Sequence, residues 1–292
     1  MSSQSPQQIA GVYRRKIGDI VVTALSDGYN DGNLDLLKNV DVNEARSILV
    51  DAFRPVRRIS INTFLAHTRD GTVLVDTGTG GSLAPTNGWL LRNLEAAGLK
   101  PQDIGAVLLT HMHPDHSAGL TNTETGKPFF PNAELVMNEA EPRYWLDDGE
   151  MARAPNDHVR SMFVHSRAQI APYKARTRLF SGGEVFPGIV AMPIPGHTPG
   201  HTGFMISSAG QQLLIWGDVV HLPEVQVALP DTGTNFDVDY EQAVKSRKRV
   251  LDQVATDKLL VTGMHLHFPG FHYVARRGSG YALHAEAWQH GL

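Results

Sequence analysis

The chain contains no cysteine among its 292 residues. This absence excludes disulfide bridges, thiolate metal ligands and a cysteine nucleophile. No apolar run reaches the length of a membrane span, and the first residues, MSSQSPQQIAGVYRRK, lack the apolar core of a signal peptide. We therefore expect a protein that does not enter a membrane and that is cytoplasmic, while a mature secreted or periplasmic form would have the same sequence.

The chain also has little excess of charge of either sign. Charged residues make up 19% of the chain, and the net charge is −4. Two short basic clusters, KARTR at 174–178 and KSRKR at 245–249, are typical of solvated loop or helix faces. This balance predicts no nucleic-acid partner.

Two common catalytic motifs are missing as well. There is no HExxH helix of the zincin type and no GxSxG nucleophile elbow. No low-complexity segment or linker divides the chain, and hydrophobic residues make up 41% of it. We expect a single domain over residues 1–292, with residues 1–17 as an extended arm.

Apolar runs ending in turn residues predict strands at 19–27, 61–68, 72–78, 104–111, 189–194, 202–208, 212–217 and 258–263. Helical periodicity predicts helices at 87–98, 138–148, 157–172 and 238–254. Asn87 is the expected N-cap of the first of these helices, and Gly98 its expected end. Strands covered by helices on both sides predict a layered α/β domain.

Every unusual polar cluster directly follows one of the apolar strands. These residues are Asp76 after TVLV, His111, His113, Asp115 and His116 after AVLLT, His197 and His201 after IVAMPI, Asp218 after LLIWG, and His265 and His267 after LLVTGM. The carboxyl ends of strands converge in layered folds. Imidazoles and carboxylates suit zinc, manganese or ferrous iron. One histidine after a strand is more often a hydrogen-bonded loop residue, but four such sites together predict a metal centre.

The motifs and their order resemble the metallo-β-lactamase superfamily. THMHPDHSAG at 110–119 matches its HxHxDH signature, and VLVDTG, PGHTPGH, WGD and the late His265 match its other motifs. The resemblance covers roughly residues 18–275. It implies an α/β fold, the four-layer αββα metallo-β-lactamase sandwich, with metals at one edge of two facing sheets.

The resemblance also implies a ligand set. One metal ion would be bound by His111, His113 and His197, and a second by Asp115, His116 and His265, with Asp218 between the two. Asp76 would orient the ligand loop, and His201 and His267 would be neighbours of the site. The implied cofactors are two divalent transition-metal ions, zinc first, with manganese, cobalt or iron as alternatives.

Such a pair of ions supplies hydroxide near neutral pH, so the implied activity is a dinuclear metal-dependent hydrolase in which a bridging hydroxide attacks the substrate. The superfamily hosts many reactions, and its fold alone does not choose among them. Asp115 beside His116 is unlike the true β-lactamases, and the chain has no room for a fused flavin domain. An iron-dependent redox enzyme in the same pocket remains the alternative from another class, and a non-catalytic binding module is the least favoured.

The second half resembles the branch that contains methyl parathion hydrolase and its lactonase relatives, notably at 130–146, 180–189, 195–218 and 265–281. Matching positions suggest that the substrate cleft is lined by Leu83, Trp145, Met162, Phe163, His221 and Phe236. Phosphotriesterases of this branch have an apolar residue at the position of His221. A hydrogen-bond donor at this position can stabilise the oxyanion that forms when hydroxide attacks an ester carbonyl. Asp115, Asp218 and His221 are the predicted catalytic residues.

These features favour hydrolysis of lactones or aryl esters, with promiscuous hydrolysis of organophosphate triesters. Organophosphate hydrolysis of the methyl parathion type as the main activity is the alternative. The expected partners are therefore a small-molecule ester, lactone or phosphotriester and, from the branch, a second copy of the chain in a homodimer.

Overall fold

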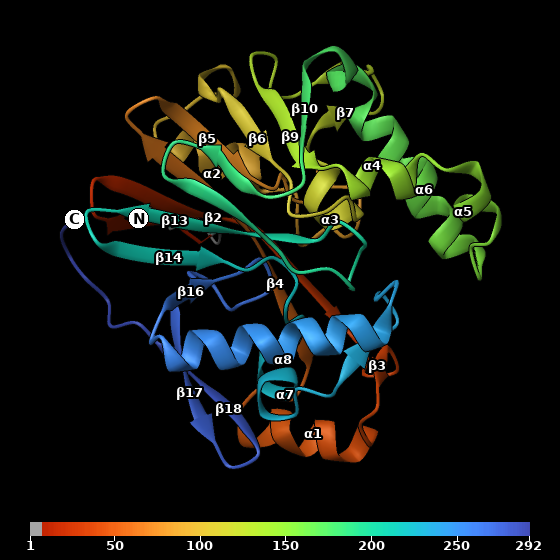
Figure 1. Cartoon of the computed structure of the whole chain (residues 1–292), viewed down its shortest axis with the longest axis vertical. Coiled ribbons are helices and arrows are strands. Elements are labelled where there is room, and N and C mark those ends of the chain that lie inside the picture. The colour runs from red at the N-terminus through yellow and green to blue at the C-terminus, as the bar shows by residue number, and fades with distance from the viewer. Residues whose placement is uncertain (1–7) are drawn as a thin grey trace, which may run out of the picture.

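The computed structural model describes residues 8–292, which form two facing mixed sheets with helices outside (Figure 1). In order across the first sheet, the strands are β1 (Val12–Ile17), β2 (Ile20–Gly32), β4 (Arg57–Thr68), β5 (Gly71–Val75), β6 (Ala106–Leu108), β9 (Glu134–Asn138) and β10 (Thr177–Phe180). Across the second they are β11 (Gly183–Phe186), β12 (Ile189–Pro193), β13 (Thr202–Ser208), β14 (Gln211–Ile215), β16 (Leu260–Thr262), β17 (His272–Arg277) and β18 (Gly280–Ala285).

Two small ladders and the helices complete the structure. β3 (Leu37–Lys38) pairs with β15 (Gly233–Thr234), and β7 (Thr121–Asn122) pairs with β8 (Lys127–Pro128). The α-helices are α1 (Val42–Asp51), α2 (Leu90–Ala96), α3 (Pro114–Ser117), α4 (Ala140–Trp145), α5 (Asp148–Ala152), α6 (Asp157–Ile170), α7 (Pro223–Ala228) and α8 (Tyr240–Thr256). Short 3-10 turns lie at η1 (Pro101–Asp103) and η2 (Ala171–Arg176).

Alternation along the strands builds three apolar layers. Phe64 of the first sheet and Leu213 of the second belong to the core between the sheets. Their neighbours Leu65 and Leu214 point to the opposite faces, because successive strand residues alternate in direction. Leu65 belongs to the layer under α2, α4 and α6, whereas Leu214 belongs to the layer under α8. The predicted αββα sandwich is thereby confirmed.

Most predicted elements are present, with shifted ends. All eight predicted strands occur, and the short run after residue 104 forms β6, whose three residues are all buried as expected. The helix predicted at 138–148 breaks into α4 and α5. Gly98 follows the end of α2 with a φ of 89°, as a glycine after a helix usually does.

Two local predictions are wrong. Residues 12–17 of the expected extended arm form β1, an edge strand that pairs with β2, while residues 1–7 of that arm lie outside the described residues. Asn87 does not cap α2, which begins at Leu90 after Trp89. The buried side chain of Asn87 instead bonds Thr79 and Asn30, so it stabilises the loop that precedes the helix.

The basic cluster at 245–249 is not wholly solvated. Arg247 on α8 is 1% exposed, and its guanidinium donates to the carbonyls of Val219 (2.7 Å), Pro230 (3.2 Å) and Thr232 (2.7 Å). Val219 directly follows the predicted ligand Asp218. Arg247 therefore joins α8 to the loop that carries that ligand.

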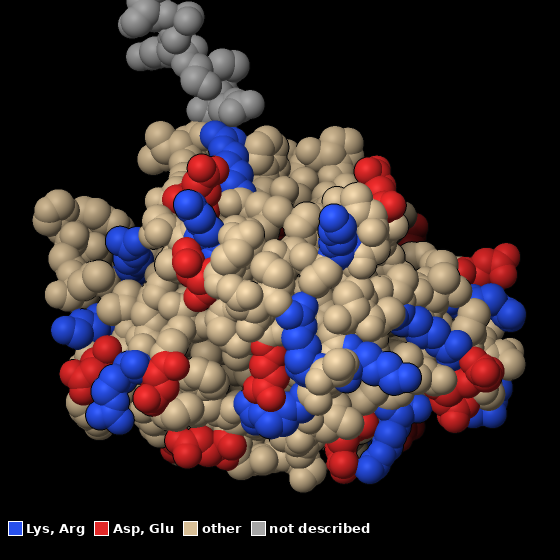
Figure 2. Space-filling model, turned by 90° about the horizontal axis from the view of Figure 1, so that it is seen from above, with Lys and Arg blue, Asp and Glu red and all other residues tan. Residues whose placement is uncertain are grey.

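The charges on the surface are mixed, in agreement with the small net charge of the chain (Figure 2). On the face shown in Figure 2, basic and acidic side chains are interspersed rather than gathered by sign. Among residues 8–292, none of the helices combines the length and the apolar character needed to cross a bilayer.

We expect Arg247→Met to lower the free energy of unfolding by about 3 kcal/mol, because the buried carbonyls of Val219 and Pro230 lose their donor and that of Thr232 loses one of its two donors. Urea unfolding of the full chain measures this change. The matched control is Lys248→Met, since Lys248 is half-exposed and only pairs with Asp231 on the surface. That control should cost no more than about 0.5 kcal/mol. Equal losses in the two variants would contradict the role of Arg247.

Candidate metal centre and substrate cleft

All seven predicted metal ligands meet at one edge of the sandwich. The loop after β6 and the start of α3 supply His111, His113, Asp115 and His116 from the first sheet. Loops after β12, β14 and β16 supply His197, Asp218 and His265 from the second sheet. The edge therefore joins both sheets at a single polar cluster, as the convergence of strand ends predicts.

Three imidazoles form the first half of the cluster. The distances are 3.0 Å from His111 Nε2 to His113 Nδ1, 2.9 Å from His113 Nδ1 to His197 Nε2, and 3.2 Å from His197 Nε2 to His111 Nε2. Burial lowers the pKa of both His111 and His113 well below the usual value, so these rings are neutral. Three nitrogens around a tetrahedral zinc ion are about 3.3 Å apart. The triangle therefore fits a divalent cation.

The second half of the cluster contains two imidazoles and two carboxylates. His265 Nε2 lies 3.4 Å from Asp115 Oδ2, and His116 Nε2 lies 3.6 Å from Asp115 Oδ1. His116 Nε2 and Asp218 Oδ1 are buried without a hydrogen-bond partner. Buried polar atoms without partners are costly, and a metal ion would satisfy these two.

Asp218 lies between the two halves. Its Oδ2 is 3.2 Å from His116 and His265, 3.4 Å from His197 and 3.8 Å from His111, measured to Nε2 in each ring. Burial alone would raise the pKa of Asp218, but the facing imidazoles outweigh it and hold that pKa well below the usual range. The carboxylate is therefore ionised and placed where it can contact ions on both sides.

In three of the five ligand rings the second nitrogen is bonded to a carboxylate or a backbone carbonyl. His116 Nδ1 bonds Asp76 (2.7 Å), His197 Nδ1 bonds Asp237 (2.9 Å), and His265 Nδ1 bonds the carbonyl of Ser60 (2.9 Å). Such acceptors fix the tautomer and the orientation of a ligand imidazole. Asp76 was expected from the sequence, whereas Asp237 and Ser60 were not, because neither follows a recognisable motif.

Asp76 has a second task and an unusual backbone. Its carboxylate accepts from the backbone N–H of Thr110 (2.7 Å) and from the Thr110 hydroxyl (2.7 Å), so it holds the start of the histidine loop. Its φ is 57°, in the left-handed region that side chains other than glycine rarely adopt. Such strain is typically tolerated at functional sites.

His201 supports Asp218 through the backbone. His201 Nδ1 donates to the carbonyl of Ile194 (2.8 Å), and His201 Nε2 accepts from the N–H of Asp218 (2.8 Å). Burial lowers the pKa of His201 to about 3, so the ring stays neutral and can accept this bond. A Cβ on Gly217 would lie 2.4 Å from His201 Nε2, which explains the glycine before Asp218. Both ring nitrogens of His201 are therefore used outside the cluster.

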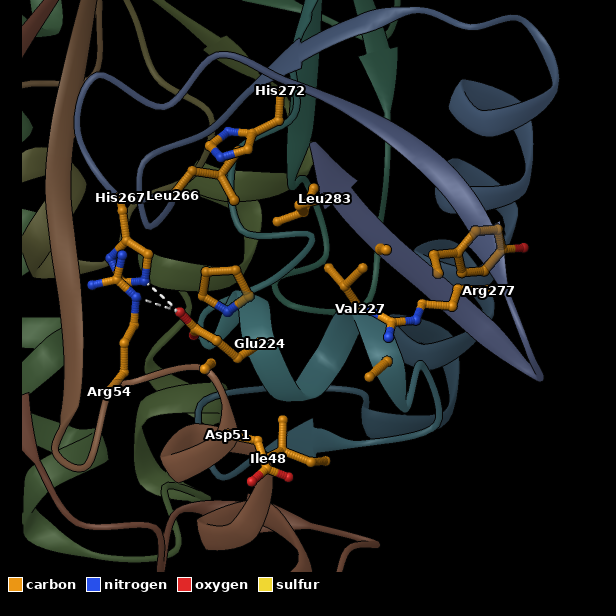
Figure 3. Close-up of a pocket in the computed structure, with 15 residues that line it drawn as sticks. Ile48, Asp51, Arg54, Glu224, Val227, Leu266, His267, His272, Arg277 and Leu283 are labelled. Atoms are coloured by element: carbon orange, nitrogen blue, oxygen red, sulfur yellow. Dashed lines mark hydrogen bonds and ion pairs between the residues drawn. The ribbon is translucent and has the colours of Figure 1, made fainter. Parts of the chain in front are cut away.

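His267 also lies outside the cluster, in a separate cavity of about 600 Å³. Figure 3 shows Arg54 and His267 converging on Glu224 of α7 in that cavity. His267 Nε2 is 2.6 Å from Glu224 Oε1, while His265 points the other way into the metal cluster. The structure thus separates the two histidines of the HLH segment.

Glu141 is a buried carboxylate that sequence analysis missed. Its two oxygens accept from the backbone of Met112 (2.9 Å) and Gly200 (2.8 Å), from the hydroxyl of Thr198 (2.5 Å) and from the indole of Trp145 (2.9 Å). Burial raises the pKa of Glu141, and these hydrogen bonds oppose the rise. One side chain therefore joins the histidine loop of the first sheet to the PGHTPGH loop of the second.

A cleft of about 440 Å³ opens onto the cluster. Four of the residues predicted for the substrate cleft line it: Leu83, Met162, His221 and Phe236. Asp115, Asp218 and His113 also contribute to its lining, so the polar cluster borders the cleft. Sequence analysis missed Asn30, Arg57 and Ile59 on the strand side and His158, Ser161 and His165 on α6. The 3.6-residue period of α6 places the last three on the face that also bears Met162.

Two residues that were expected to line the substrate cleft, Trp145 and Phe163, do not line the 440 Å³ cleft. Trp145 is 1% exposed and lines a neighbouring cavity of about 460 Å³ together with His113, Met162 and Phe236. Phe163 is fully buried behind it, with its ring centroid 4.7 Å from that of Trp145, and it lines neither cavity. The prediction that Phe163 lines the cleft is therefore wrong, because the phase of α6 turns it into the core.

His221 faces the cluster from the loop after β14. Its Nε2 is 3.1 Å from Asp218 Oδ2, and its ring stacks on His265 with centroids 5.3 Å apart. Burial lowers the pKa of His221 to about 4, against the opposing effect of Asp218. Gln226 fixes the loop by accepting from the N–H groups of His221 (2.6 Å) and Leu222 (3.0 Å). A neutral imidazole is thus held with one nitrogen directed at the reacting centre.

Comparison with known proteins agrees with this geometry. Residues 56–265 match the metallo-beta-lactamase superfamily. The structure is similar to a crystal structure of the hydrolase AbOPH in the beta lactamase superfamily, with a TM-score of 0.92, 30% identity, and coverage of 97% of this chain and 100% of the other. It is also similar to AidC, a dizinc quorum-quenching lactonase, with a TM-score of 0.90, 27% identity, and coverage of 96% and 99%.

A similar sequence is the N-acyl homoserine lactonase of a Bacillus species, which is 24% identical over 220 residues, or 68% of this chain and 78% of the relative. Two facing sheets with a His/Asp cluster at their edge place this chain in the class of metal-dependent hydrolases. The chain belongs to the metallo-beta-lactamase superfamily.

We expect Asp237→Ala to weaken zinc binding about 10–100-fold, because His197 loses the acceptor that orients its ring. Competition with a chromogenic zinc chelator measures the affinity. The matched control is Asp239→Ala two residues further on, where the side chain only caps α8 by accepting from Gln242 N. The control should lose about 1 kcal/mol of stability but keep the zinc affinity. Unchanged zinc binding in Asp237→Ala would contradict the proposed orientation of His197.

Proposed function

We propose that the protein is a dinuclear metal-dependent hydrolase that opens lactones or aryl esters, with slower hydrolysis of organophosphate triesters. The observation that carries this proposal is the position of Asp218 Oδ2, within 3.8 Å of four predicted ligands from both halves of the cluster, at the floor of a substrate-sized cleft. Two bound ions, most simply zinc, would polarise the attacked carbonyl and supply hydroxide near neutral pH.

In the proposed reaction, oxygen from water bonds to the carbonyl carbon, the bond from that carbon to the ring or leaving oxygen breaks, and the leaving oxygen gains a proton. His221 would donate a hydrogen bond to the oxygen that becomes negative, since its neutral ring is directed at the cluster. Asp115 is the most exposed of the ligand side chains, at 21%, and it borders the cleft. It is therefore the group we assign to carry the proton to the leaving oxygen.

The relatives support a carbonyl substrate. AidC is described as a dizinc lactonase, and the similar Bacillus proteins are named N-acyl homoserine lactonases. The walls formed by Leu83, Ile59 and Met162 are apolar and would also accept the aryl group of a phosphotriester. Organophosphate hydrolysis as the main activity is thus the second candidate, and iron-dependent redox chemistry in the same pocket is the third.

The first test is a substrate panel on zinc-loaded protein: N-acyl-homoserine lactones, dihydrocoumarin, an aryl acetate and a methyl paraoxon-type triester. We expect the highest kcat/KM with a lactone or aryl ester, loss of activity on chelation and recovery with zinc, manganese or cobalt, because the ions supply the nucleophile. Elemental analysis should give about two metal ions per chain. Full activity without metal, or a requirement for oxygen, would overturn the proposal.

The second test replaces the donor with an apolar residue of similar size. His221→Leu should lower lactonase kcat/KM about tenfold, while triesterase kcat/KM holds or rises, because only the carbonyl substrate loses a donor. The ratio of the two activities is the quantity to measure, since it cancels losses of folded protein. Metal content is the control, because His221 also lies within reach of the His197–Asp218 group. A parallel fall of both activities, or loss of a metal ion, would assign His221 a structural or ligand role.

A further inference from the structure

A second polar feature of the cleft lies away from the metal cluster, on the β2–β4 ladder. Arg57 and Ile59 of β4 pair with Gly32 and Asn30 of β2. Side chains of paired residues lie on the same face of a sheet, and alternate residues share that face. Arg57, Ile59 and Asn30 accordingly all line the 440 Å³ cleft.

The neighbouring arginine points to the opposite face and is fully engaged there. Arg58 forms two hydrogen bonds to Asp31, each of 2.7 Å, and its guanidinium lies 3.9 Å from the ring centroid of Tyr29. Both oxygens of Asp31 are used in this pair. Asp31, the carboxylate whose charge acts on Arg57, is therefore already bound to another cation.

Gly32 provides the space that Arg57 occupies. A Cβ at Gly32 would lie 2.0 Å from Arg57 Nη2 and 2.8 Å from its Cζ. The φ of Gly32 is not in the left-handed region, so backbone strain does not require a glycine at this position. The guanidinium therefore lies over this strand position, where a side chain would otherwise be.

Within residues 8–292, no side chain or carbonyl accepts a hydrogen bond from the side chain of Arg57. Its Nε is buried without a hydrogen bond, and burial lowers the pKa of the side chain, with only the charge of Asp31 opposing that change. A partly desolvated cation without a hydrogen-bond acceptor is costly, so its presence in a cleft indicates a ligand contact. Asn30 adds a second donor, because its Oδ1 accepts from Asn87 Nδ2 at 2.7 Å and leaves its own Nδ2 free to donate.

We propose that Arg57, supported by Asn30, selects substrates that carry an oxygen acceptor outside the scissile carbonyl. The inference rests on the proposed function, since it names the class of lactone that this cleft prefers. A cavity of 440 Å³ is about 9 Å across if it is treated as a sphere, so the acceptor lies only a few bonds from the reacting carbon. Amide carbonyls and carboxylates both offer this oxygen, and a hydrocarbon side chain offers none.

The test compares three γ-butyrolactones on zinc-loaded protein: one with an N-acyl amide arm, one with a carboxylate and one with a plain alkyl chain. In Arg57→Met, kcat/KM for an acceptor-bearing lactone should fall about 10–100-fold relative to the alkyl lactone, mainly through KM. The arm that loses most identifies the acceptor as amide or carboxylate. Arg58→Met, the matched control on the opposite face, should leave the ratio unchanged.

Gly32→Ala supplies an independent variant that keeps the arginine but displaces it. It should shift the same ratio in the same direction as Arg57→Met. Calorimetric binding of the non-hydrolysable lactam analogue of the N-acyl lactone separates this inference from the proposed function. If wild-type protein hydrolysed neither a lactone nor an aryl ester, the proposed function would fail. If the ratio and the binding of the lactam were the same in wild type, Arg57→Met and Gly32→Ala, the role of Arg57 would be overturned.

Discussion

The structure depends on holding five nearly buried imidazoles around one carboxylate oxygen. Asp218 Oδ2 lies within 3.8 Å of His111, His116, His197, His221 and His265. Buried atoms of this set, such as His116 Nε2 and Asp218 Oδ1, remain without a partner unless a cation lies among the ligand atoms. The fold fixes four of these rings from behind, through Thr110, Asp76, Asp237 and the carbonyl of Ser60, so that their ligand geometry exists before any ion arrives.

The groups that hold the ligand loops in place are buried polar residues, most of them in segments without a recognisable motif. Glu141 ties the histidine loop to the PGHTPGH loop, His201 holds the backbone of Asp218, and Gln226 and Arg247 fix the segment that follows it. Each is nearly inaccessible to solvent. Their hydrogen bonds offset the cost of burial, and this makes the edge of the sandwich rigid where the chemistry is proposed.

The sequence predicted the parts of the fold that depend on local pattern. Apolar runs marked the central strands, and the contiguous HxHxDH segment marked the histidine loop. Asp237 could not be predicted, because it bonds His197 from 40 positions further along the chain, in a loop without a motif. Glu141 resembled one of the acidic residues of a solvated helix. The choice between Met162 and Phe163 depended on helix phase, because neighbouring residues on a helix differ by about 100° in direction.

The division of the cluster between the two sheets has a thermodynamic consequence. Four predicted ligands belong to the first sheet and three to the second, so a bound ion would act as a cross-link that the unfolded chain lacks. Any ligand that binds only the folded state adds stability in proportion to the logarithm of its free concentration. The persistence of the folded protein would then follow the supply of metal in its surroundings. A shortage of metal would then shorten the lifetime of the folded protein as well as abolish its proposed activity.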